Sequence, residues 1–159
     1  GKLHGLPFTI KDIHLLKGLV SCVGCLGLKD KVAKEDSTVV SRLKQEGAIA
    51  LGLTNVPEFL CSYETDNLVY GRTNNPYDLT KTPGGSSGGC AALVATGCSP
   101  FSIGSDAGGS IRWPAHCTGL AAHKPSIGLV PRTGSPMGNA RGLLAQFATS
   151  GPIARRVED

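Results

Sequence analysis

Short apolar segments separated by glycine, proline and polar residues predict alternating strands and helices. Leu6–Ile10 is typical of a short strand, and Ala48–Leu53 of a buried strand. Between them, Asp36 or Ser37 can cap a helix that ends at Gly47. The apolar face of that helix consists of Val39, Val40 and Leu43. This strand–helix–strand order predicts an α/β layer.

The second half of the chain places two glycine–serine loops around one helix and one strand. A long loop is expected over residues 66–83, followed by the first glycine–serine loop, Gly84–Gly89. Cys90–Ala95 predicts a buried helix and Phe101–Ile103 a strand, after which Gly104–Ser110 forms the second loop. A helix and the strand that returns beside it cover similar distances, so the two loops are expected to meet at one edge of a sheet.

Composition narrows the class of protein. The chain has 159 residues, enough for one core, and 40% of them are hydrophobic, which argues against a disordered chain. No apolar run is long enough to span a membrane. Aromatic residues make up only 5% and do not accompany a basic cluster, so no nucleic-acid partner is expected. Because the chain starts at Gly1 and ends directly after a charged run, we expect an internal fragment.

The six cysteines give little support to a metal site. Cys22 and Cys25 have C-x-x-C spacing, but neither a second C-x-x-C pair nor a paired histidine motif accompanies them. No metal site is therefore expected, and no organic cofactor is expected either. Scattered cysteines in a chain of this length favour a reducing, intracellular location.

Glycine beside serine lets backbone N–H groups converge, and three kinds of chemistry could use this arrangement. A phosphate-binding loop is one, but no Gly-Lys-Ser/Thr follows the glycines. The second is the G-x-S-x-G nucleophile elbow, which Gly84–Gly88 matches. That motif needs a downstream histidine, for which only His116 and His123 are available.

The third possibility is a serine nucleophile activated without histidine. Lys11 ends an apolar strand, and burial there would lower its pKa and make it a base. Ser110 follows Asp106–Gly109, whose successive N–H groups could stabilise an oxyanion. Ser86 could relay a proton between Ser110 and Lys11.

Three segments together resemble the amidase signature family of serine hydrolases. They are Leu6–Asp12, Gly84–Gly89 and Gly104–Pro114, in the order and spacing of that family. Within the family the chain is most similar to the fatty-acid amide hydrolase 2 group, on the segments Thr54–Pro57, Tyr70–Asp78 and His123–Pro131. The resemblance implies an α/β fold with a mixed central sheet flanked by helices, of which residues 1–159 form part of one amidase domain.

The resemblance also implies roles for individual residues. Ser110 corresponds to the nucleophile, Ser86 to a bridging serine held by a cis peptide, and Lys11 to the base. Ser87 corresponds to a supporting serine, and Leu60 to a residue that lines the acyl site. The implied oxyanion hole consists of the N–H groups of Ala107, Gly108, Gly109 and Ser110. Two positions depart from the fatty-acid amide hydrolases: Cys90 stands where an acidic residue is common, and Ala107 replaces a bulkier residue.

The implied activity is cleavage of small-molecule carboxylic amides, of the fatty-acid amide type, through an acyl-enzyme. Two alternatives stay open. One is the glutamine-hydrolysing subunit of an aminoacyl-tRNA amidotransferase, and the other is a catalytically inactive relative that binds a ligand. Membrane association would require segments outside these 159 residues.

Overall fold

Five strands of the described residues form one mixed sheet. The computed structural model describes residues 1–137 and 142–159, and its strands lie in the order β2-β1-β3-β5-β4. β1 is parallel to both β2 and β3, whereas β5 is antiparallel to β3 and β4. The strands are β1 (Pro7–Lys11), β2 (Ile49–Thr54), β3 (Phe101–Asp106), β4 (Ala121–Ala122) and β5 (Thr149–Ala154).

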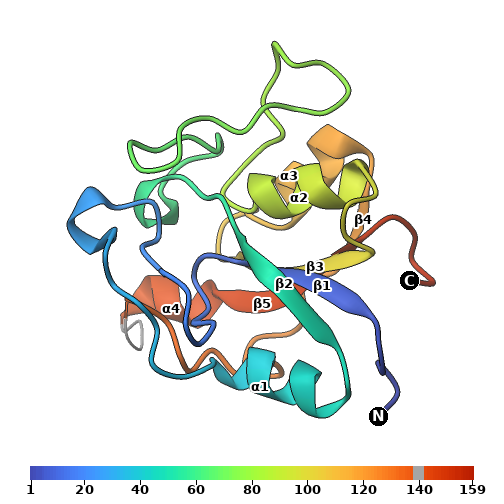
Figure 1. Cartoon of the computed structure of the whole chain (residues 1–159). Helices are drawn as coiled ribbons and strands as arrows, with labels where there is room; N and C mark the ends of the chain where they lie inside the picture. Colours follow the sequence, from blue (N-terminus) through green and yellow to red (C-terminus); the bar gives the residue numbers. More distant parts are fainter. Residues whose placement is uncertain (138–141) are drawn as a thin grey trace.

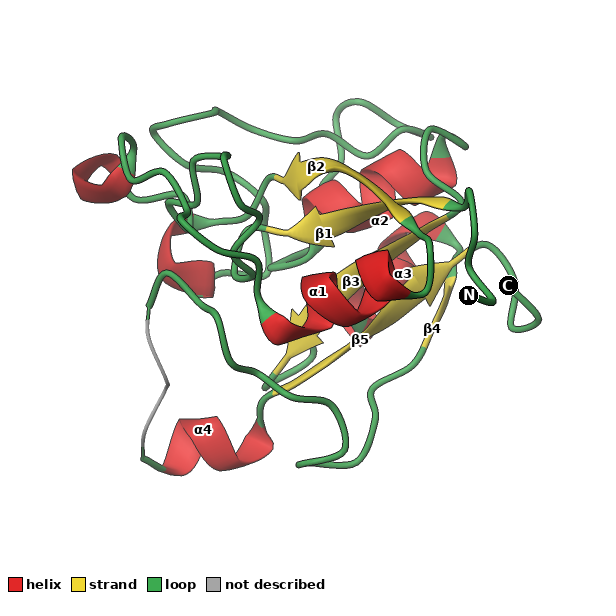
Figure 2. Cartoon of the chain, turned by 60° about the horizontal axis from the view of Figure 1, so that its bottom comes forward, coloured by secondary structure: helices red, strands yellow, loops and turns green. Residues whose placement is uncertain are grey.

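Helices cover both faces of this sheet. Figure 1 shows α1 on one side and α2 with α3 on the other, and Figure 2 shows the strands from a second direction. The helices are α1 (Thr38–Gln45), α2 (Gly88–Ala95), α3 (Arg112–Thr118) and α4 (Leu143–Phe147), and two short 3-10 helices span Leu26–Leu28 and Glu58–Leu60. This layering confirms the α/β fold class that the sequence predicts.

Side chains alternate along β1, so the core residues of this strand point to one face of the sheet and the lysine of the site points to the other. Phe8 and Ile10 are fully buried and pack with Val40 of α1. Thr9 and Lys11 have the opposite orientation, because successive strand residues point to opposite faces. Lys11 thereby reaches the loop that precedes α2.

The predicted strand over Ala48–Leu53 is found at Ile49–Thr54, but it is not buried. Ile49 and Leu51 are 52% and 53% exposed, because β2 lies at the edge of the sheet and only its other face packs on the core. The apolar composition of the segment could not distinguish an edge strand from a central one.

The second glycine–serine loop is shorter than predicted. The strand that was expected to end at Ile103 continues to Asp106, because all six residues of β3 pair with β5. The loop therefore begins at Ala107. Neither β5 nor α4 was predicted from the sequence.

The start of α1 differs in detail from the prediction. Ser37 occupies the N-cap position, but its side chain makes no capping hydrogen bond. The Asp36 carboxylate instead accepts a hydrogen bond from Lys44 Nζ at 2.8 Å. Gly47 follows the helix with a φ of 92°, in agreement with the predicted end.

Candidate active site

Lys11 is the buried lysine at the centre of this site. Its side chain has no exposed surface, and Nζ lies 2.7 Å from Ser86 Oγ and 3.2 Å from the carbonyl oxygen of Ser105. Burial lowers the pKa of Lys11 to about 7, although Cys90 and Asp106 nearby act in the opposite direction. A substantial fraction of this amine is therefore neutral at physiological pH.

Ser86 lies in a tight turn directly after Gly85, a position at which a side chain would not fit. The Gly85–Ser86 peptide bond is cis, and Ser86 is 1% exposed. A Cβ on Gly85 would lie 2.6 Å from the carbonyl oxygen of Glu64. The absence of a side chain at this position is what permits the close approach of the two backbones.

Ser87 connects the two glycine–serine loops. Its backbone N–H donates to the carbonyl oxygen of Ser110 at 3.2 Å, and its hydroxyl lies 3.3 Å from the carbonyl oxygen of Ser105. The loops therefore meet beyond the carboxyl ends of β1 and β3, as the sequence predicts.

Asp106 organises the loop that carries Ser110. Its carboxylate accepts hydrogen bonds from the N–H groups of Gly109 and Ile111, at 2.8 and 3.0 Å, and pairs with the Arg112 guanidinium. Burial alone would raise the pKa of Asp106, but the hydrogen bonds from Arg112, Ile111 and Gly109 lower it to about 2. Asp106 is thus a fixed anion at neutral pH.

The hydrogen bond from the Gly109 N–H to Asp106 reduces the number of expected oxyanion donors that are free. The N–H of Gly109 already donates to Asp106, so it is occupied in this structure. No side chain of the described residues accepts a hydrogen bond from the N–H groups of Ala107, Gly108 or Ser110. These three groups are therefore the available donors.

A cavity of about 360 Å³ lies beside the reactive side chains. Ser86, Ser110 and Ala107 line it, and so does Leu60. No hydrogen bond joins the hydroxyls of Ser86 and Ser110, although both face this cavity. The other lining residues are Ile13, His14, Phe59, Cys61, Ser105, Arg132, Ser135, Met137, Ala145, Ala148 and Ser150.

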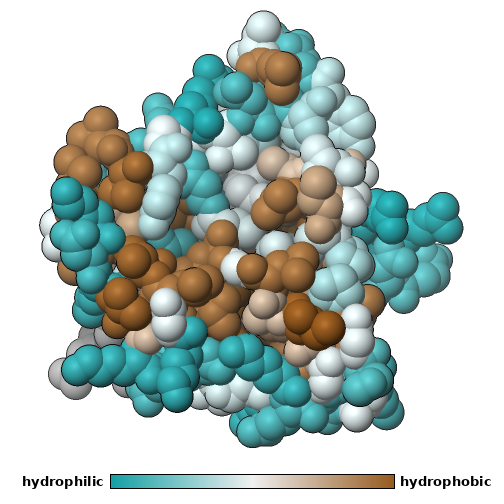
Figure 3. Space-filling view, viewed as in Figure 1, coloured by the Kyte–Doolittle hydropathy of each residue, from teal (hydrophilic) through white to brown (hydrophobic). Residues whose placement is uncertain are grey.

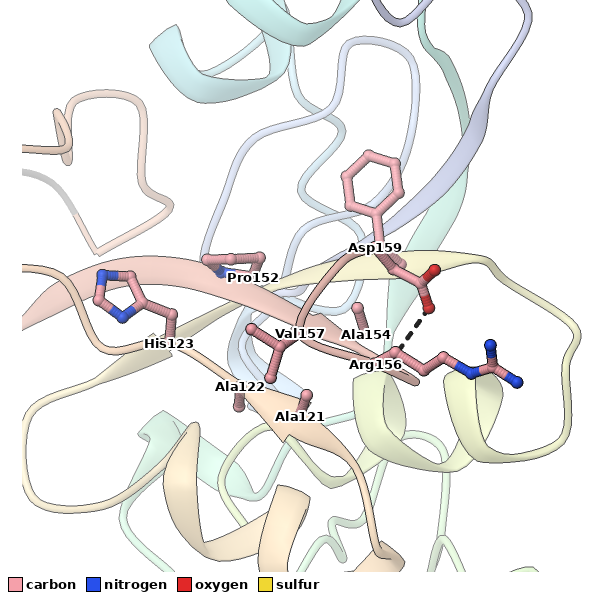
Figure 4. Close-up of a pocket in the computed structure, with 9 residues that line it drawn as sticks. Ala121, Ala122, His123, Pro152, Ala154, Arg156, Val157 and Asp159 are labelled. Atoms are coloured by element: carbon pink, nitrogen blue, oxygen red, sulfur yellow. Dashed lines mark hydrogen bonds between the residues drawn. The ribbon is translucent and has the colours of Figure 1, made fainter.

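The histidines that the nucleophile-elbow interpretation requires do not reach this cavity. His116 is exposed and its ring stacks on Trp113. His123 lines a separate cavity of about 350 Å³ beside β4 and β5 (Figure 4). The structure therefore brings Lys11, and neither of these histidines, to Ser86.

Sequence reasoning missed a third histidine and several supporting contacts. His14 is 3% exposed, lines the cavity, and has Nε2 at 3.2 Å from Ser150 Oγ. The feature of the sequence that could have indicated His14 is its position three residues after Lys11, directly beyond the end of a strand. The Tyr63 hydroxyl also donates to the carbonyl oxygen of Gly108 at 2.8 Å, which supports the nucleophile loop.

The described residues hold neither a metal cluster nor a membrane-spanning helix. No group of three or more histidine, cysteine or acidic side chains in residues 1–137 and 142–159 is arranged to hold a metal ion. Among those residues, no helix is both long and apolar enough to cross a bilayer.

Comparison with known proteins gives consistent matches across the chain. The profile of a family described as Amidase matches residues 1–159. The chain is 47% identical over 156 residues to fatty-acid amide hydrolase 2 of Homo sapiens, covering 98% of this chain and 29% of the human protein. It is 44% identical to a glutamyl-tRNA(Gln) amidotransferase subunit of Picosynechococcus sp., covering 100% of this chain and 32% of that protein.

A solved structure agrees with these matches. The solved structure of a fatty acid amide hydrolase superimposes with a TM-score of 0.90 at 31% sequence identity, over 99% of this chain and 27% of the other. The 159 residues thus span about a third or less of the length of the proteins they match.

Proposed function

Because this chain belongs to the amidase family, we propose that its parent protein is a serine hydrolase that cleaves carboxylic amides with Lys11, Ser86 and Ser110. The observation that carries the proposal is the 2.7 Å contact between the fully buried Lys11 amine and the Ser86 hydroxyl. A buried lysine that contacts one serine, where that serine lines a cavity together with a second serine, is the arrangement that nucleophilic catalysis without histidine requires.

In the acylation step, neutral Lys11 accepts a proton from Ser86 while Ser86 accepts one from Ser110. The Ser110 oxygen then attacks the amide carbonyl carbon and forms a tetrahedral intermediate. The negative charge moves to the carbonyl oxygen, where we expect the N–H groups of Ala107, Gly108 and Ser110 to stabilise it. One such donor typically lowers the barrier by about 2.7–4 kcal/mol.

Collapse of the intermediate breaks the carbon–nitrogen bond. The proton held by Lys11 returns through Ser86 to the leaving nitrogen, which departs as a neutral amine or ammonia. Water then attacks the acyl-enzyme by the same proton route and releases the carboxylic acid and free Ser110. Ser87 supports the arrangement by holding the two loops together.

Fatty-acid amides are the substrate class that we propose first. The support is the 47% identity to fatty-acid amide hydrolase 2 and the apolar side chains of Phe59, Leu60 and Met137 in the cavity. An apolar cavity wall stabilises a hydrocarbon chain because it removes that chain from water.

A glutamine-hydrolysing subunit is the second candidate. The 44% identity to the Picosynechococcus amidotransferase protein favours it, since that relative matches the whole chain as well. Glutaminase activity that depends on a partner subunit would support this candidate, and turnover of long-chain acyl amides by the protein alone would support the first. An inactive binding relative is disfavoured, because Lys11, Ser86 and Ser110 are all present.

The test is active-site labelling of the full-length parent. A fluorophosphonate probe, located by peptide mass spectrometry, is expected on Ser110 and is expected to be lost in Lys11→Ala. Lys17→Ala is the matched control, because Lys17 is an exposed lysine of the same segment, and it should label like wild type.

Other labelling results would contradict the assignment. Label on Ser86 or Ser87 would show that Ser110 is not the nucleophile. A folded protein without any label would favour the inactive relative, or a subunit that needs its partner.

A further inference from the structure

One wall of the cavity beside Ser86 and Ser110 carries a positive charge. Arg132 is half-buried there, and its Nη1 donates to the carbonyl oxygen of Ala145. No carboxylate is among the described residues that line the cavity, and the two ion pairs of the described residues involve Lys44 and Arg112 instead. A guanidinium has five N–H donors, so most of them remain for a ligand.

The Arg132 segment is held in place from two sides. Leu15 N–H donates to the carbonyl oxygen of Gly134 at 3.0 Å, and Thr38 N–H donates to that of Thr133 at 3.2 Å. The backbone next to Arg132 is therefore fixed both to the segment that follows β1 and to the first turn of α1. A binding group needs such support to present its donors in one orientation.

His14 and Ser150 add neutral polar groups to the same cavity. Their side chains are in contact through His14 Nε2, while His14 Nδ1 is buried and makes no regular hydrogen bond within the part of the chain described here, although the Gly104 backbone lies beside the ring. Burial, followed by the charges of Lys11 and Arg132, lowers the pKa of His14 to about 4. At neutral pH His14 therefore offers hydrogen bonding without a second positive charge.

We infer that Arg132, together with His14 and Ser150, forms a subsite for a carboxylate, and that the fatty-acid amide proposed above as the substrate carries a carboxylate besides its scissile amide. The inference rests on the proposed amidase function, because the reacting serines line the same cavity. Guanidinium and carboxylate form paired hydrogen bonds in one plane, so a single arginine suits a carboxylate. The apolar side chains of Phe59 and Met137 suit the carbon chain that would join the two groups.

The test uses matched substrates and the full-length parent protein. Adipamic acid is compared with hexanamide, and hexanoylglycine with hexanoylethanolamine, so that the carboxylate lies on the acyl side in one pair and on the amine side in the other. In at least one pair, kcat/KM is expected to favour the charged amide by at least about tenfold. Arg132→Gln should reduce that ratio by about tenfold or more, and Arg132→Lys should retain part of it.

Arg42→Gln is the matched control. It removes the same charge from an exposed position on α1, so the ratio should remain that of wild type. Hydrolysis of the neutral amides without any preference for the charged ones would overturn the carboxylate subsite and leave the amidase function intact. A preference that survives in Arg132→Gln would also overturn it. Failure to hydrolyse any of the four amides, together with an unlabelled Ser110, would overturn the proposed function and this inference together.

Discussion

Burial gives Lys11 a chemistry that an exposed lysine does not have. Its position on β1 directs the amine to the face where α2 packs, and the surrounding groups remove it from water. Transfer of an ammonium group from water is unfavourable, so the neutral amine is favoured. The same burial that makes the lysine costly to protonate makes it useful as a base.

The pH dependence of the full-length parent tests this role. Because the pKa of Lys11 is about 7 and the proposed base acts as the neutral amine, kcat/KM for an amide should rise between about pH 5 and 8 and then level off. Activity should fall at low pH because acid protonates the proposed base, Lys11. A profile that is constant across this range would contradict the assignment.

Cys90 offers a matched pair of variants for the same measurement. Its thiol is fully buried close to Lys11, and burial raises the pKa of that thiol, so it is neutral at pH 7. Cys90→Asp should shift the midpoint of the profile upward, because a nearby carboxylate stabilises the ammonium form. Cys90→Ser adds no charge and should leave the midpoint where it is.

At the scale of elements, parallel pairing brings the two loops together. β1 and β3 are neighbours and run in the same direction, so the residues that follow them emerge at one edge. α2 lies between β2 and β3 in the chain, and Ser86 precedes its first turn. β5 then lines the same cavity through Ser150, although it follows Lys11 by more than a hundred residues.

The contact between the Arg132 segment and α1 depends on Gly134. Its φ is 85°, and a Cβ there would lie 2.5 Å from Ser37 Cα. Gly134→Ala should therefore lower the free energy of unfolding by roughly 1–3 kcal/mol for the steric conflict, in addition to about 1 kcal/mol for the backbone conformation. Urea denaturation of the full-length protein measures the change.

Gly128→Ala is the control for this substitution. Gly128 has nearly the same φ, 84°, but nothing lies within 4 Å of a Cβ built on it. Only the conformational cost of about 1 kcal/mol is expected there. Equal destabilisation by the two variants would show that the contact with Ser37 contributes nothing.

At the scale of the 159-residue chain, β2 is the outermost strand of the five-stranded sheet that the described residues form. Figure 3 shows apolar side chains across the face of the molecule on which β2 lies. Ile49 and Leu51 of this strand are each more than half exposed. An exposed apolar edge strand favours pairing with another chain, because its backbone groups lack partners.

The 159-residue chain is accordingly expected to self-associate in solution. Light scattering over a concentration series should show assembly, and replacement of both Ile49 and Leu51 by lysine should reduce it. Leu68→Lys is the control, because Leu68 is 82% exposed but lies in a loop. Equal reduction by the control, or a monomer at all concentrations, would contradict a role for the edge of β2.

Local patterns were sufficient to predict much of the fold. The apolar segments around Phe8 and Val40 and the glycine–serine loops around Ser86 and Ser110 were found because each depends on neighbours in the sequence. β5 was missed because its six residues acquire their structure from β3, which lies about fifty residues earlier. The exposure of β2 was missed because it depends on where the strand lies in the sheet.

The sequence by itself determined which reactive groups are present, in what order they occur, and that glycines flank the serines. Tertiary structure decided how those groups behave. Lys11 and Ser86 are 75 residues apart in sequence, and only folding places them 2.7 Å apart and excludes water from the amine. Folding likewise brings His14 and Arg132 to the cavity and keeps His116 and His123 away from it. The physical reason is that pKa and access are set by the atoms surrounding a side chain, and most of those atoms come from distant parts of the chain.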